Sequence, residues 1–225
     1  MIKAVIFDMY ETLITLYNSP NYFGPHMAAD AGIPVDRFKE IWSPMEGDRS
    51  IGKISLEDIL ELILRKNDCY SKELLDKLVE KRVWAKAECF KHLNPEIIPL
   101  LKKLKGNNIK IGLISNCFSE EAKLIRESIL FPYFDVAMLS YEQGVKKPDE
   151  EIYRRCMKEL NVTPEEILYV GDGGSLELEA ARHLGMNTIQ AVWYLKEGTN
   201  QPTGRKEEFE QAERPLDILK CIYER

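Results

Sequence analysis

The fold is decided by Met1-Ile2-Lys3-Ala4-Val5-Ile6-Phe7-Asp8, a short apolar run that ends on an acid. Its apolar part, Ala4–Phe7, is continuous rather than alternating, which is typical of a strand buried on both faces of a parallel sheet. Similar runs follow at Ile109–Ile114, Ile167–Val170 and Thr188–Val192, with a weaker one at Phe134–Leu139. These runs predict a parallel sheet that begins with the first apolar run.

Between these runs, apolar residues recur at the spacing of helices. The predicted helices are Pro95–Lys105, Ser119–Leu130, Asp149–Leu160, Leu176–Leu184 and a short last one near Pro215–Tyr223. Ser119 is expected to cap its helix, with Glu120 and Glu121 in the first turn. The polar tail at Gly198–Glu213 is predicted to be a loop. Strand and helix alternate from about residue 94 to 192, so we expect a doubly wound, Rossmann-like α/β fold.

The stretch from Tyr17 to His92 breaks this alternation and contains no convincing strand. Its predicted helices are Tyr22–Ala31, Pro34–Ile41, Leu56–Arg65 and Ser71–Phe90, the last with Trp84 on its apolar stripe. We therefore expect an α/β core domain of residues 1–16 and 93–225, interrupted by an all-helical cap domain of residues 17–92.

The composition excludes several classes of partner. The chain of 225 residues carries 31 Lys and Arg against 37 Asp and Glu, a net charge of −6. Nucleic-acid binding and anionic membranes both call for a basic surface, so neither is an expected partner. No apolar stretch approaches the roughly 20 residues of a membrane span. The five cysteines are odd in number and form no Cys-x-x-Cys, which fits free thiols and a cytoplasmic protein.

Polar side chains follow the predicted strands, and in a parallel sheet the carboxyl ends of the strands form the ligand-binding edge. They are Asp8 after the first run, Ser115 and Asn116 after the second, Lys147 after the weak run, and Asp172 with Glu177 after the next. An acid, a hydroxyl, a lysine and further acids are therefore expected at one edge of the sheet.

These residue types suit phosphoryl or acyl transfer. A carboxylate at Asp8 is a candidate nucleophile that forms a covalent intermediate. Asp172 beside it would meet like-charge repulsion unless a cation lay between them, and Mg²⁺ prefers a few carboxylates with water and substrate oxygens. Ser115 could hydrogen-bond a phosphoryl group or an oxyanion, and Lys147 could neutralise its charge.

The chain resembles the haloacid dehalogenase superfamily through Asp8-Met9-Tyr10-Glu11-Thr12-Leu13, Ser115-Asn116, Lys147-Pro148-Asp149 and Gly171-Asp172 with Glu177. These four motifs occur in the family's order and span nearly the whole chain, and the helical insertion corresponds to the C1 cap of the first subfamily. The resemblance implies a hydrolase with Asp8 as nucleophile and with Ser115, Asn116 and Lys147 around the transferred group. It also implies a Mg²⁺ site made by Asp8, the backbone carbonyl of Tyr10, Asp172 and Glu177.

One position departs from the family's phosphatases, which carry a second Asp as general acid and base where this chain has Tyr10. A tyrosine, with an ordinary pKa of about 10, is a poor base at neutral pH. The family's 2-haloacid dehalogenases share Asp-x-Tyr and need no metal. They generally lack the Gly-Asp motif, however, and carry an Arg for the substrate carboxylate, whereas no Arg lies between Tyr10 and Arg37 here.

The retained acids favour a Mg²⁺-dependent phosphatase that acts on a small phosphorylated metabolite. Two alternatives stay open: a dehalogenase-type carbon–halogen hydrolase, and a non-catalytic phosphoryl-binding protein that lacks the general acid. Tyr10 remains a catalytic candidate with Asp8 and Lys147, and His26 is a candidate base. Arg49 is the candidate for an anionic substrate group. We expect a monomer or a homodimer.

Overall fold

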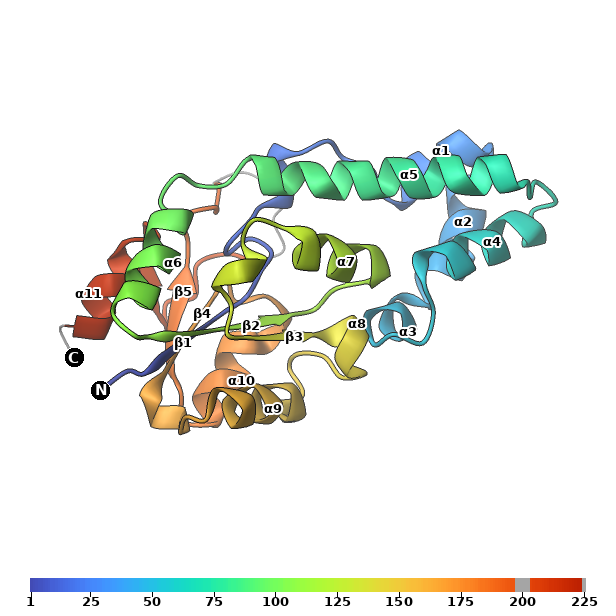
Figure 1. Cartoon of the computed structure of the whole chain (residues 1–225). Coiled ribbons are helices and arrows are strands. Elements are labelled where there is room, and N and C mark those ends of the chain that lie inside the picture. Colours follow the sequence, from blue (N-terminus) through green and yellow to red (C-terminus); the bar gives the residue numbers. More distant parts are fainter. Residues whose placement is uncertain (197–202, 224–225) are drawn as a thin grey trace.

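The computed structural model describes residues 1–196 and 203–223, and its centre is a parallel sheet (Figure 1). The strands are β1 (Ala4–Phe7), β2 (Lys110–Ser115), β3 (Val136–Leu139), β4 (Ile167–Gly171), β5 (Asn187–Ala191) and β6 (Glu210–Ala212). Their order is β3-β2-β1-β4-β5-β6, and every neighbouring pair is parallel. The predicted doubly wound α/β fold is confirmed, with β1 in the middle of the sheet.

Helices cover both faces of the sheet, which explains why the central strand β1 is apolar at every position. On one face lie α6 (Ile97–Gly106), α7 (Ser119–Glu127) and α11 (Asp217–Tyr223), and on the other lie α9 (Glu150–Leu160) and α10 (Glu177–His183). Val5 and Phe7 of β1 pack in the first of these two cores, whereas Ala4 and Ile6 pack in the second. The short α8 (Ser140–Gln143) follows β3.

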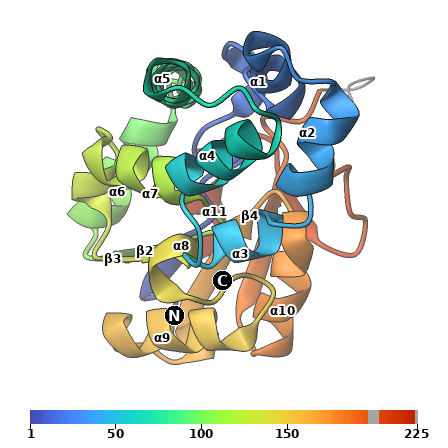
Figure 2. The same cartoon turned by 90° about the vertical axis from the view of Figure 1, so that its right-hand side faces the viewer.

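The segment between β1 and α6 is helical in the part that follows Tyr22, as predicted. Its helices are α1 (Gly24–Ala31), α2 (Val35–Trp42), α3 (Glu46–Ser50), α4 (Leu56–Lys66) and α5 (Lys72–Glu88). All of them except α3 contribute to a shared apolar core, in which Met27, Phe38, Ile59 and Leu78 are fully buried. In Figure 1, α1, α2 and α4 lie away from the sheet, and α5 runs back towards α6. Figure 2 shows α5 nearly end-on, and this helix contacts α7 of the core.

Short 3₁₀ turns complete the chain at Leu16–Asn18, Cys89–Lys91, Phe131–Tyr133, Pro164–Glu166 and Gly174–Leu176. Within residues 1–196 and 203–223, no helix combines the length and the apolar character needed to cross a bilayer.

Three local predictions are wrong, and the short helices α3 and α8 were not predicted. Ser119 is the first residue of α7 rather than its cap, and its hydroxyl accepts a hydrogen bond from the backbone amide of Leu56 (3.0 Å). Trp84 is 55% exposed, because α5 buries Arg82 and Lys86 on its inner face. The five-residue α3 is too short to show a period in the sequence. Finally, part of the expected tail loop forms β6, while residues 198–202 lie outside the described part of the chain.

Candidate active site

A cavity of about 580 Å³ opens at the carboxyl edge of the sheet, and we call it the Asp8 cavity. It is lined by six of the predicted site residues: Asp8, Tyr10, Asn116, Lys147, Asp172 and Glu177. The edge forms because β1, β2 and β4 run parallel, so that loops far apart in the sequence follow adjacent strands.

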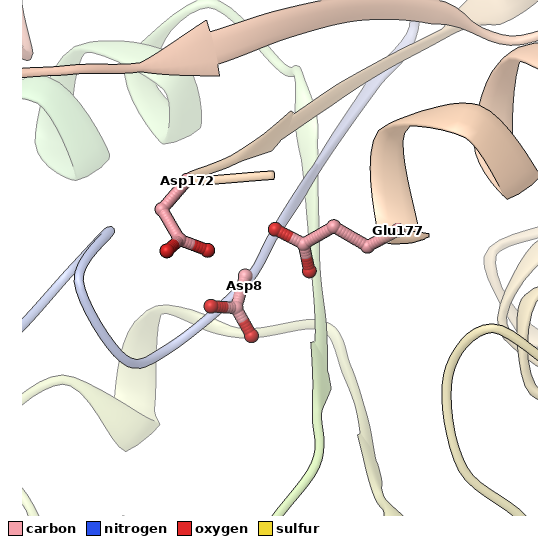
Figure 3. A group of neighbouring side chains, drawn as sticks. All are labelled: Asp8, Asp172 and Glu177. Atoms are coloured by element: carbon pink, nitrogen blue, oxygen red, sulfur yellow. The ribbon is translucent and has the colours of Figure 1, made fainter. Parts of the chain in front are cut away.

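Three carboxylates face one another in this cavity (Figure 3). Asp8 follows β1, Asp172 follows β4, and Glu177 begins α10. One oxygen from each lies within 4.8 Å of the others, and all three side chains are buried. Burial raises the pKa of Asp8, with Lys147 opposing the shift, and burial also raises the pKa of Glu177. Ionising all three carboxyl groups together is therefore costly, because water cannot screen the repulsion between their charges.

Lys147 supplies the positive charge in contact with two of these acids. Its Nζ lies 2.5 Å from Oδ1 of Asp8 and also contacts the carboxylate of Glu177. Burial alone would lower the pKa of Lys147, but the two neighbouring carboxylates hold it above its ordinary value. Three ionised carboxylates would exceed this single ammonium, which contacts only Asp8 and Glu177.

Neighbouring side chains and backbone amides hold these charged groups in place. The side-chain amide of Asn116 brackets Lys147: its Oδ1 accepts from the Lys147 amide (2.8 Å), and its Nδ2 donates to the Lys147 carbonyl (3.0 Å). The amide of Gly174 donates to Oδ1 of Asp172 (2.9 Å). The hydroxyl of Tyr169 donates to Oε2 of Glu177 (3.0 Å). Asn116, expected to bind substrate, thus also holds the site lysine in place.

Gly171 makes room for Glu177. A Cβ at Gly171 would lie 2.0 Å from Oε1 of Glu177, so Gly171→Ala must displace this carboxylate. We expect Gly171→Ala to lower the free energy of unfolding by about 1–3 kcal/mol, as overpacking does, measured by chemical denaturation. Gly106→Ala is the matched control, because a Cβ at Gly106 would meet no atom within 4 Å and the change should be neutral or mildly stabilising. Equal effects of the two substitutions would contradict this account.

Two hydroxyls near the site are buried without a hydrogen-bond partner among the described residues: those of Tyr10 and Ser115. Ser115 ends β2 and is fully buried, but it does not line the Asp8 cavity. Burial, reinforced by Glu121, raises the pKa of Tyr10 well above its ordinary value, so the phenol stays protonated. Tyr10 can therefore donate a hydrogen bond but cannot act as a base near neutral pH.

Two other sequence candidates lie outside the Asp8 cavity. Arg49 is 1% exposed and lines a separate cavity of about 330 Å³, which we call the Arg49 cavity. His26 is exposed on α1, where its Nδ1 accepts a hydrogen bond from the amide of Phe23 (3.2 Å). It lines neither cavity, so the structure gives no support to His26 as a base.

Glu11, a buried acid that lines the Asp8 cavity, was not predicted from the sequence. Its carboxylate accepts from the hydroxyl of Thr15 (2.6 Å) and from the amide of Leu16 (2.8 Å), and its φ is +57°. The signal in the sequence was its place three residues after Asp8, in the turn that leaves β1. A left-handed conformation at a non-glycine residue beside a group of buried carboxylates is typical of a functional turn.

The chemistry of the acidic group fits a hard divalent cation. All its donors are oxygens, which Mg²⁺ prefers to nitrogen or sulfur. The three carboxylates also exceed the single ammonium in contact with them, which a divalent cation would balance.

Comparisons with known proteins agree with this architecture. The family model of the haloacid dehalogenase-like hydrolases matches residues 2–185. The glyceraldehyde 3-phosphate phosphatase of Methanocaldococcus jannaschii is 28% identical over 205 residues, which cover 85% of this chain and 86% of that protein.

Two solved structures share the fold over nearly their whole length. One is a phosphatase of this superfamily from Thermococcus onnurineus, with a TM-score of 0.68, 21% identity, and coverage of 99% of this chain and 98% of that one. The other is a 2-haloacid dehalogenase from Pseudomonas syringae, with a TM-score of 0.73, 21% identity, and coverage of 100% and 99%. At such identities the likeness concerns the fold alone. Together with the matching family model, it shows that the chain belongs to the haloacid dehalogenase-like hydrolases.

Proposed function

We propose that the protein is a Mg²⁺-dependent phosphatase that transfers a phosphoryl group to Asp8. The observation that carries this proposal is the acidic group of Asp8, Asp172 and Glu177, with Lys147 in contact with Asp8 and Glu177. A carboxylate nucleophile, a cation site and a fixed ammonium are the parts that phosphoryl transfer needs. The similarity to the M. jannaschii protein, which is named as a phosphatase, supports the same assignment.

The reaction has two steps. A carboxylate oxygen of Asp8 attacks phosphorus, the bond between phosphorus and the leaving oxygen breaks, and that oxygen takes a proton from water. Water then attacks the phosphorus of the aspartyl phosphate, which releases inorganic phosphate and restores the carboxylate. Lys147 stays charged and orients Asp8. Ser115 has a buried hydroxyl without a partner among the described residues and is the proposed donor for a phosphoryl oxygen, although it would have to become accessible from the Asp8 cavity, which it does not line.

Asp8, Asp172 and the backbone carbonyl of Tyr10 would hold Mg²⁺, which when bound supplies charge neutralisation for the transferred phosphoryl group. Glu177 acts as an orienting neighbour, because both its oxygens already accept hydrogen bonds, from Lys147, Tyr169 and the Gly173 amide. The helices of residues 17–92 act as a cap over this edge, which is consistent with their separate apolar core.

The activity test uses an aryl phosphate and a panel of metabolite phosphates, with Mg²⁺ and with EDTA. Metal-dependent release of phosphate is the expected result. Release of halide from 2-chloropropionate without metal would instead support a dehalogenase. Binding of a phosphate analogue with no turnover would point to a phosphoryl-binding protein that lacks catalysis.

Mg²⁺ should also stabilise the fold, independently of turnover. A ligand at a hundred times its dissociation constant adds about 2.7 kcal/mol to the free energy of unfolding. For a chain of this size that raises the Tm by roughly 5–10 °C, which a thermal melt can measure. Asp172→Asn should remove most of this shift, whereas Asp36→Asn, an exposed control on α2, should retain it. A full shift in Asp172→Asn would place the cation elsewhere.

A further inference from the structure

The Arg49 cavity lies beside the Asp8 cavity, and Tyr10, Leu16 and Asn116 line both. Its other walls come from both parts of the chain: α1, α2, α3 and α5 of the helical segment, and the start of α7 in the core. A molecule whose reacting group lies at Asp8 therefore has a neighbouring space of about 330 Å³ for the rest of its structure.

Arg49 is the unusual group in this second cavity. Its guanidinium lies between the rings of Trp42 and Phe118, 3.9 and 4.0 Å from their centroids. Stacking on both faces leaves only the edge of the guanidinium for hydrogen bonds. One of the nitrogens on this edge, Nη2, lies 3.5 Å from Oε1 of Glu120. The other two, Nε and Nη1, have no hydrogen-bond partner among the described residues. An arginine that is 1% exposed thus holds unused donors beside a cavity.

The neighbouring carboxylates are already engaged by other cations. Oε1 of Glu120 also lies 3.2 Å from Nε of Arg82, and Oε1 of Glu121 lies 2.6 Å from Nζ of Lys86. Within this buried group, three cations share two carboxylates. A third carboxylate, Glu46, also lines the cavity and acts on Arg49, but it is exposed to solvent, which screens its charge. Uncompensated buried charge is costly, so the cavity is electrostatically suited to one more anion.

Tyr10 connects the two cavities. Its phenol is protonated, its hydroxyl has no partner among the residues described, and the Nζ of Lys86 lies 5.3 Å from its ring. The residue that departs from the phosphatase motif is therefore part of the wall that a substrate spanning both cavities would touch.

We infer that the substrate is a phosphomonoester carrying a second anionic group, a carboxylate or a phosphate, on its leaving group, and that Arg49 binds this second anion. The inference rests on the proposed phosphatase function, because it places the phosphoryl group at Asp8. Arg49 presents the planar, forked donors that recognise either anion through paired hydrogen bonds. The alcohol released by hydrolysis would retain the second anion.

The experiment compares three series of phosphomonoesters of matched length, two to six carbons: alkyl phosphates, ω-phosphooxy carboxylates and α,ω-bisphosphates. With the Mg²⁺-loaded protein, we expect kcat/KM for one length of an anionic series to exceed that of the alkyl phosphate by about 10- to 100-fold. The favoured series identifies the second anion. Hydrolysis of alkyl and aryl phosphates without any such preference would overturn the inference and leave the phosphatase function standing.

In Arg49→Met, the ratio of kcat/KM for the favoured anionic substrate to kcat/KM for the alkyl phosphate should fall to near one. Arg49→Lys should retain only part of this preference. Arg65→Met is the matched control: Arg65 also stacks on a ring, 3.9 Å from the centroid of Tyr70, but it is exposed on α4. This control should keep the wild-type ratio.

Binding to the Asp8→Asn protein tests the inference without turnover. Calorimetry with the same three series should give the same order of affinities, with a 10- to 100-fold advantage for the favoured anionic series. Equal affinities for charged and uncharged tails would overturn the inference even if the protein hydrolyses nothing.

Discussion

Asp8→Asn is expected to reduce phosphatase turnover by at least about 10⁴-fold, because loss of a covalent nucleophile removes the reaction path itself. The same substitution should stabilise the Mg²⁺-free protein by about 1 kcal/mol, since it removes one of three carboxylates that are buried together. Lys147 keeps its contact with Glu177 in the variant. Activity and stability should therefore change in opposite directions.

Steady-state kinetics with an aryl phosphate and chemical denaturation in EDTA measure the two effects on one preparation. A matched control is Asp36→Asn, on the exposed first turn of α2, which should leave both quantities close to the wild-type values. Residual turnover above about 1% would mean that another group carries the phosphoryl intermediate, and a destabilised Asp8→Asn protein would contradict the electrostatic account.

Lys147→Met is expected to lower the free energy of unfolding by about 3–5 kcal/mol, measured in EDTA. The substitution leaves two contacting carboxylates buried without their ammonium, and breaking a buried ion pair from one side has a cost of this order. Turnover should be lost as well, because Asp8 loses the group that orients it.

Lys146→Met is the natural control, since it makes the same change one residue earlier, on a side chain that is only half-buried. It should alter the stability by no more than about 0.5 kcal/mol. Adding Glu177→Gln to Lys147→Met should recover part of the loss, because it removes one of the carboxylates left unpaired. A Lys147→Met protein as stable as the wild type would show that the acids are neutral in the folded state.

The apolar runs predicted the strands of the core well for a physical reason. Because the sheet is covered on both faces, every residue of β1 is apolar, and the run can be recognised without knowing which residues face which side of the sheet. β6 was missed because Glu210–Ala212 is a polar edge strand with a single paired neighbour, β5. Such a strand is held by backbone hydrogen bonds, which impose little pattern of apolar residues on the sequence.

The part of the site that lies at the ends of the strands could be predicted from the sequence. Asp8, Lys147 and Asp172 could be brought together from topology alone, but the ion pairs of the helical segment could not. Glu120 has the sequence signature of a first-turn acid that stabilises a helix dipole. It does lie in the first turn of α7, but it is also buried against Arg82 of α5. A pairing across 38 positions depends on how the helices pack, and no local pattern encodes that.

The central position of β1 has a consequence for synthesis of the chain. Its neighbours begin at Lys110 and Ile167, roughly 100 and 160 residues after Ala4. At ordinary translation rates the nascent β1 therefore waits on the order of ten seconds or more before its second partner leaves the ribosome. During that interval an aggregation-prone apolar strand is unpaired, which makes it a target for chaperones. Asp8 is translated early, yet the acidic group of Asp8, Asp172 and Glu177 is complete only when most of the chain has been made.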